Sequence, residues 1–133
     1  MRISEHTGES AADEVPSEQQ RLLRTAFRPD RRMKLLYTNF HSGSGGGHTT
    51  YIRELARGLS GRHEVHVAAP EDSRLLHEAR GIPGLHAFAQ TYPNGLRTLP
   101  ARRRACARLH AYLEEHRFDI VHVNGSADHR LVI

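Results

Sequence analysis

The run FHSGSGGGHTTYI at residues 40–52 places four glycines within positions 43–47, with a histidine on either side at 41 and 48. Glycine has no Cβ, so the backbone N–H groups of such a run can approach a ligand oxygen closely. A phosphate suits this geometry best where the run leads into a helix, because the first N–H groups and the helix dipole both favour negative charge. The sequence therefore favours an anion-binding or substrate-lining loop. A plain connector is the alternative that stays open.

Polar residues beside the glycines are the next candidates for ligand contacts. His41 follows an apolar run and is placed to meet a substrate hydroxyl, and the ring of His48 can face a cleft. Thr49 and Thr50 are first of all candidates for capping the next helix, and ligand contacts second. Two familiar phosphate loops do not fit. No lysine follows the glycines as the P-loop requires, and GxGxxG counted from Gly43 fails at its sixth position, which leaves a nicotinamide site only weakly supported.

Other residues with chemical potential show no supporting pattern. Four arginines at 102, 103, 104 and 108 share the polar side of one expected helix, without interleaved aromatic residues for stacking on bases. We expect a solvated face there, or contact with anionic lipid headgroups, and no nucleic acid. Six further histidines lack ligand-like spacing, so no metal site is expected. These histidines are His63, His66, His77, His86, His110 and His116.

Length and composition bound the architecture that must position these residues. The chain has 133 residues, a net charge of +4 and 38% apolar residues, with a mean hydropathy of −0.61. Residues 1–32 are polar and lack a sustained period, so we expect a flexible extension without the features of a signal peptide. The lone Cys106 fits a reducing cytoplasm and is expected to be buried or half-buried. No apolar run is long enough to span a membrane.

From residue 33 onward, strand patterns alternate with helix patterns. Strands are expected at residues 34–40, 63–70, 85–90 and 118–125, and helices at 48–61, 71–81, 99–117 and 126–133. This order predicts a parallel, Rossmann-like α/β sheet of four to five strands with flanking helices. The near-continuous apolar pattern of 118–125 predicts a strand covered on both faces. Ser73 or Asp72 and Ser126 are expected helix caps, and the last helix pattern stops so soon that we expect a sheet incomplete at the C-terminus.

Two segments, taken in order, resemble a known family. They are MKLLYTNFHSGSGGGHTTYIRELARGLSGRHEVHVAAP at residues 33–70 and FDIVHVNG at residues 118–125. Together they resemble the N-terminal, acceptor-side domain of family 4 glycosyltransferases, which have two Rossmann-like domains in the GT-B fold. The resemblance covers about residues 33–133. It implies a retaining transfer of a sugar from a nucleotide-sugar to an acceptor, without an essential metal at the diphosphate.

The resemblance also implies roles for individual residues. Gly46 and Gly47 match the family's glycine pair, and the N–H of Gly47 would contact the diphosphate of the sugar donor. His122 matches the first histidine of a His-x-His that commonly ends a family strand, whereas Asn124 replaces the second. Together with Asp128, just beyond, these two residues are the candidates for the catalytic centre. Three loop residues are assigned to the acceptor: His41, His48 and Thr49.

We therefore expect a glycosyltransferase N-terminal domain at residues 33–133 that is inactive without a donor-binding C-terminal domain. Its expected partners are a nucleotide-sugar, that missing domain, and a glycan, lipid-linked or small-molecule acceptor. No cofactor is expected. The expected location is the cytoplasm, with peripheral contact with an anionic membrane surface at its inner face as an additional option. Two alternatives stay open: a nicotinamide-dependent oxidoreductase fragment and a non-catalytic ligand-binding module.

Overall fold

The computed structural model describes residues 17–26 and 30–133, and it divides the chain into two units at Arg31 and Arg32. Most of the extension expected at 1–32 lies outside the described residues. Within the first unit, α1 spans Glu18–Ala26. Ser17 and Gln20 form a capping box at its start: the Ser17 hydroxyl accepts from the Gln20 N–H at 3.3 Å, and the Gln20 side chain accepts from the Ser17 N–H at 3.1 Å.

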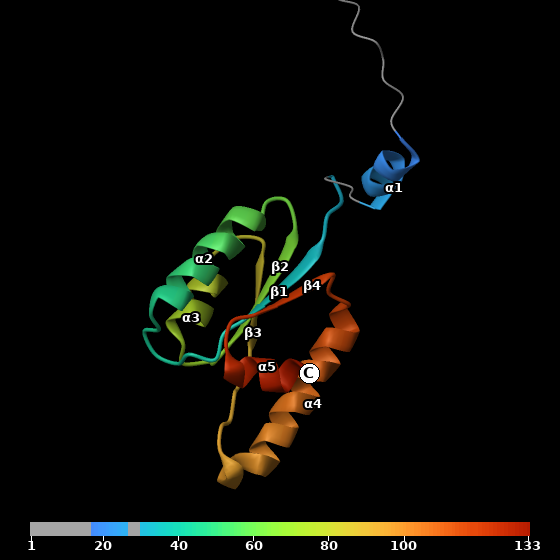
Figure 1. Cartoon of the computed structure of the whole chain (residues 1–133). Helices are drawn as coiled ribbons and strands as arrows, with labels where there is room; N and C mark the ends of the chain where they lie inside the picture. The colour runs from blue at the N-terminus through green and yellow to red at the C-terminus, as the bar shows by residue number, and fades with distance from the viewer. Residues whose placement is uncertain (1–16, 27–29) are drawn as a thin grey trace, which may run out of the picture. The chain divides into compact units, whose positions relative to one another are not determined.

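The second unit alternates strands and helices, as the apolar patterns predict (Figure 1). Its strands are β1 (Lys34–Thr38), β2 (Glu64–Ala69), β3 (Leu85–Ala89) and β4 (Ile120–Val123). Its helices are α2 (Gly47–Leu59), α3 (Arg74–Arg80), α4 (Leu99–His116) and α5 (Ser126–Val132), with a short 3-10 turn, η1 (Leu96–Thr98), before α4.

The four strands form one parallel sheet in the order β3-β2-β1-β4. Helices α2 and α3 lie on one face, and α4 and α5 lie on the other (Figure 1). Because β1 is central, its residues pair with β2 on one side and with β4 on the other, as Leu35 does with Val65 and Ile120. This arrangement confirms the predicted Rossmann-like α/β fold.

Alternation along β1 separates the two cores. Leu35 and Tyr37 point into the core beneath α2 and α3, where Ile52 and Leu76 are fully buried. Leu36 points into the opposite core, beneath α4 and α5. Successive side chains of a strand point to opposite faces of the sheet, and helices cover both faces at β1. Both sets of side chains are therefore buried, which explains why the β1 pattern is continuously apolar.

The second core is smaller and contains more partly buried residues. Leu109 and Leu131 are its largest fully buried members from the helices that cover this face. Cys106 is half-buried, as expected, and its thiol lies 3.6 Å from the Leu131 carbonyl oxygen. No helix in the described part of the chain is both long and apolar enough to cross a membrane.

Three local predictions are wrong. β4 is an edge strand of the described sheet, and Ile120 is 50% exposed because α2 and α3 cover the other strands on that face. Neither Thr49 nor Thr50 caps α2, whose N-cap is Gly46 without a side-chain cap bond. Ser126 is the first residue of α5 and not its cap. The cap prediction for α3, in contrast, is confirmed. The hydroxyl of Ser73 caps the first turn of this helix by accepting from the Leu76 N–H.

Candidate functional site

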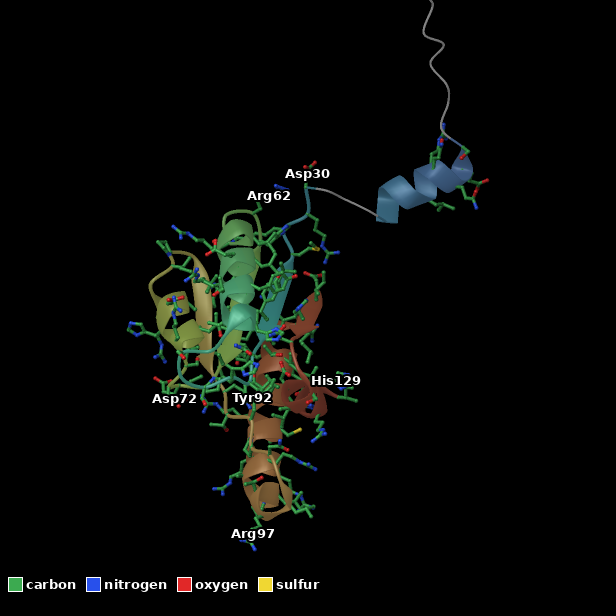
Figure 2. All side chains as sticks on the ribbon, turned by 60° about the vertical axis from the view of Figure 1, so that its left-hand side comes forward. Asp30, Arg62, Asp72, Tyr92, Arg97 and His129 are labelled. Carbon is green, nitrogen blue, oxygen red and sulfur yellow. The ribbon has the colours of Figure 1, made fainter. Side chains whose placement is uncertain are left out.

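The candidate site lies at the carboxyl ends of the strands, where open α/β sheets bind their ligands. Here β1 ends at Thr38 and β4 ends at Val123. The glycine loop, residues 39–46 between β1 and α2, and the β4–α5 turn therefore follow neighbouring strands. Figure 2 labels Tyr92 toward this end of the sheet and Arg62 toward the other. Two connections far apart in the sequence are therefore brought to one edge.

The glycine loop is fixed at several points. Gly43 and Gly45 both adopt the left-handed region, with φ values of 66° and 64°. The Gly43 carbonyl accepts from the Arg74 N–H at 2.7 Å, which ties the loop to the start of α3. A Cβ added to Gly45 would lie 1.9 Å from the Thr49 Oγ1. These contacts define a folded loop, which disfavours the plain-connector alternative.

Gly46 and Gly47 differ from Gly45 in what surrounds them. A Cβ added to either would meet no atom within 4 Å. Gly46 is the N-cap of α2 and Gly47 its first residue, and both are exposed. The first N–H groups of a helix have no partner inside the helix, and the positive end of the dipole lies there. Since the first turn of α2 carries no acidic residue, this helix start is open to an anion.

Asn39 is a residue of this edge that the sequence interpretation missed. It is fully buried, and its N–H donates to the Ala68 carbonyl at 3.0 Å. Its amide nitrogen donates to Thr49 Oγ1 at 3.4 Å, and its side-chain oxygen accepts from the His41 N–H at 3.4 Å. Thr49, predicted to contact the acceptor, is only 2% exposed. A polar residue directly behind a buried strand was the available signal for Asn39.

The two histidines that flank the glycines come together in the fold. The rings of His41 and His48 are parallel within 10°, with centroids 5.7 Å apart. The ring of Phe40 lies 4.1 Å from that of His41 on the loop. His48 is exposed and His41 is half-buried. Sequence separation alone would not reveal this stacked pair, which borders the start of α2.

Asp128 holds the two strand ends together. Its carboxylate is fully buried, and Oδ2 accepts from the Thr38 hydroxyl at 2.7 Å and from the Asn124 N–H at 3.0 Å. Among the described residues, the Asp128 Oδ1 and the Asn124 side-chain nitrogen are buried without a hydrogen-bond partner. A buried polar atom without a partner is costly, so a water or a ligand is expected to meet these two atoms.

A close approach at Gly125 positions the same turn. A Cβ added there would lie 2.2 Å from Phe40 Cε1, so only glycine lets this ring pack against the backbone between β4 and α5. Phe40 thus contacts the turn that carries Asn124 and the loop residue His41. The sequence interpretation did not single out Phe40 or Gly125.

The structure places His122 beside two tyrosine rings. Its register partner is Tyr37, whose ring centroid lies 5.3 Å away, and the ring of Tyr51 from α2 lies at 6.5 Å. His122 lines a mainly apolar pocket of about 200 Å³ between β1, β4 and the end of α2. Burial, and then the nearby Tyr51, raise the pKa of Tyr37. Of the three residues assigned to catalysis, Asn124 and Asp128 are joined by a hydrogen bond, and His122 lines this pocket.

Comparison with known proteins identifies the family. The sequence model of glycosyltransferase family 4 matches residues 45–133, and the chain belongs to this family. The match begins within the glycine loop and includes α2 through α5. Neither a curated protein nor a solved structure matches the chain. The predicted family and fold are both confirmed, and family membership supports a glycosyltransferase-type function with sugar and acceptor substrates.

Proposed function

We propose that this chain forms the acceptor-side domain of a retaining glycosyltransferase and that the start of α2 stabilises the diphosphate of a nucleotide-sugar. The observation that carries this proposal is the open space at Gly46 and Gly47, beside a loop that is otherwise held tightly in place. Their N–H groups would favour the negative charge that develops on the departing diphosphate. No metal is required for this electrostatic role.

The acceptor is proposed to bind beside the stacked rings of His41 and His48. Imidazole nitrogens can donate to or accept from sugar hydroxyls, and His48 is exposed at the start of α2. Thr49 is buried, so its proposed contribution is to position the loop through the hydrogen bond with Asn39.

Asn124 and Asp128 are proposed to orient the transferred sugar. Their unpartnered buried atoms are one donor and one acceptor, a combination that matches a sugar hydroxyl. Asp128 also fixes the Asn124 backbone relative to β1, which makes it a positioning residue. The ring of His122 lies beside those of Tyr37 and Tyr51. Its catalytic role stays a prediction.

For the acceptor, we propose more specifically a lipid-linked molecule. Arg102, Arg103 and Arg104 are exposed on α4 and can contact anionic headgroups at a membrane surface. Arg108 is also exposed, but its guanidinium carbon lies over the ring of Phe88, 4.9 Å from the centroid. The first three arginines therefore form the surface that is available for such a contact.

A titration that follows backbone amide signals by NMR tests the diphosphate proposal. UDP, GDP and a nicotinamide dinucleotide would be added separately to the full chain. We expect the nucleoside diphosphates to shift the amide signals of Gly46, Gly47 and His48. Selective binding of the dinucleotide at these positions would overturn the proposal in favour of an oxidoreductase.

Two substitutions at one position make this test sharper. Proline is well tolerated at the first residue of a helix but has no N–H, so Gly47→Pro removes the proposed donor while keeping α2. Gly47→Ala is the matched control, because it keeps the N–H and its Cβ meets no atom within 4 Å. We expect Gly47→Pro to abolish the shifts and Gly47→Ala to retain part of them. Equal binding by both variants would contradict an N–H contact at Gly47.

A further inference from the structure

A second cluster of chemically active side chains lies at the opposite end of the sheet. Glu64 and His66 stand at the start of β2 and point to the same face, two residues apart. His116 is the last residue of α4, which covers that face. The predicted absence of a metal site depended on sequence spacing, and the fold brings these three residues together across more than fifty positions.

The geometry of the cluster suits a metal ion. One ligand atom from each of Glu64, His66 and His116 lies within 4.8 Å of the other two. Glu64 Oε1 and His66 Nε2 are 3.0 Å apart. A tetrahedral zinc ion with bonds of about 2.0–2.2 Å separates neighbouring ligand atoms by about 3.3–3.5 Å. Small side-chain rotations would therefore bring the cluster to ligand distance.

Tyr112 supplies an outer contact that orients the central histidine. Its hydroxyl lies 2.5 Å from His66 Nδ1, while His66 Nε2 faces Glu64. Metal-binding histidines commonly donate their second ring N–H to an oxygen, which fixes both the tautomer and the ring. Metal binding would place the proton on Nδ1, directed at Tyr112, and would replace the hydrogen bond between His66 Nε2 and Glu64 with bonds from both groups to the ion.

Burial holds the central ring in place. His66 is 1% exposed, and its ring stacks on that of His86 at 4.4 Å. It also meets the ring of His116 at 4.8 Å and the edge of Phe118 at 4.9 Å. A ligand that is locked by packing loses little entropy when it binds, which favours a preformed site.

One charged neighbour bears on the binding of a cation at this cluster. A metal ion binds the ionised carboxylate of Glu64 and the neutral imidazoles of His66 and His116. The Lys34 ammonium, 3.3 Å from Glu64 Oε1, competes with a cation, but its side chain is 39% exposed and free to rotate toward solvent.

We propose that Glu64, His66 and His116 bind a divalent transition-metal ion, with zinc as the occupant and water in the fourth position. Two imidazoles and one carboxylate form a donor set that zinc accepts. The ion would connect the start of β2 to the end of α4. The site is independent of the glycine loop, which follows the opposite ends of the strands.

Metal titration of the full chain, produced without an affinity tag and treated with a chelator, tests the proposal. Cobalt(II) serves as a spectroscopic substitute for zinc, because tetrahedral cobalt absorbs visible light far more strongly than hexahydrated cobalt. We expect one cobalt per chain with the intense tetrahedral spectrum, loss of that spectrum when zinc is added, and a higher unfolding temperature with zinc. A weak octahedral spectrum with no change in unfolding temperature would overturn the proposal.

Substitutions assign the ligands and separate binding from folding. Glu64→Gln keeps the shape and the hydrogen-bonding oxygen but removes the charge, so the fold should persist while zinc affinity falls at least tenfold. Tyr112→Phe removes only the outer contact, for which about a 10–100-fold loss of affinity is typical. His77→Ala on α3 is the matched control, because His77 is exposed and lies outside the cluster. Equal affinity in Glu64→Gln and His77→Ala would refute the site.

Discussion

Substitution of Gly45 by alanine should destabilise the domain by several kcal/mol, whereas the same change two residues later should not. At Gly45, φ is +64°, and an L-residue in this region costs about 1–2 kcal/mol. The new Cβ would also lie 1.9 Å from Oγ1 and 2.8 Å from Cβ of Thr49, so the loop or Thr49 must move. Strain of this kind costs about 1–3 kcal/mol, and the Asn39–Thr49 hydrogen bond is lost with it. Together we expect a loss of about 2–5 kcal/mol.

Urea unfolding followed by circular dichroism measures this loss. Because domains of this size have about 5–15 kcal/mol of stability, the midpoint for Gly45→Ala should fall by a large fraction of its value. Gly47→Ala places a methyl group in open space at a helical position, so it should leave stability unchanged or raise it by up to about 1 kcal/mol. If the midpoint for Gly45→Ala equals that of the unmodified chain, the loop does not press on Thr49 and the reasoning is refuted.

Two further predictions concern buried polar groups. Asp128→Ala leaves the buried Thr38 hydroxyl and the partly buried Asn124 N–H without their acceptor, so we expect a loss of about 2–5 kcal/mol in urea unfolding. Asp128→Asn keeps an oxygen for both donors and should lose clearly less stability. Equal losses would contradict the assigned hydrogen bonds. Burial, and then the nearby Asp128, raise the pKa of Tyr92, whose hydroxyl donates to the Ala68 carbonyl at 3.0 Å. The stability that comes from keeping Tyr92 neutral is present below its unfolded pKa of about 10 and is lost as the pH rises above it. In Tyr92→Phe, unfolding measured between pH 8 and 11 should therefore show a shallower alkaline loss, and an unchanged slope would contradict the burial effect.

The elements of the fold follow from sequence patterns because each is a local property. Continuous apolar runs predicted β1 and β2, and the hydroxyl of Ser73 was correctly placed as the cap of α3. The cap of α2 was not predictable in this way. The Thr49 hydroxyl accepts a hydrogen bond from Asn39, and its side chain lies close to Gly45. These contacts form only in the folded chain, so the sequence pattern does not reveal them.

The candidate site was predictable in part. Glycines between a strand and a helix indicate an anion site because of backbone geometry alone. Which face of β4 carries His122 depends on its register with Tyr37, and burial of Asp128 depends on the distant Thr38. Likewise, Glu64 and His116 become neighbours only because α4 ends above the start of β2. Long-range pairing decides these features, and no sequence spacing records it.

The division of the core into two faces has a consequence for the order of folding. Among the described residues, the core beneath α2 and α3 is built from residues 33–89, whereas the opposite core also requires residues 105–132. The first layer can therefore form from nearby βαβ contacts as soon as β3 has been synthesised. β4 must then return across the sheet to pair with β1, as when Ile120 meets Leu35. Pairings between such distant residues are slow to form, so we expect α4, β4 and α5 to dock last, onto a surface that already exists.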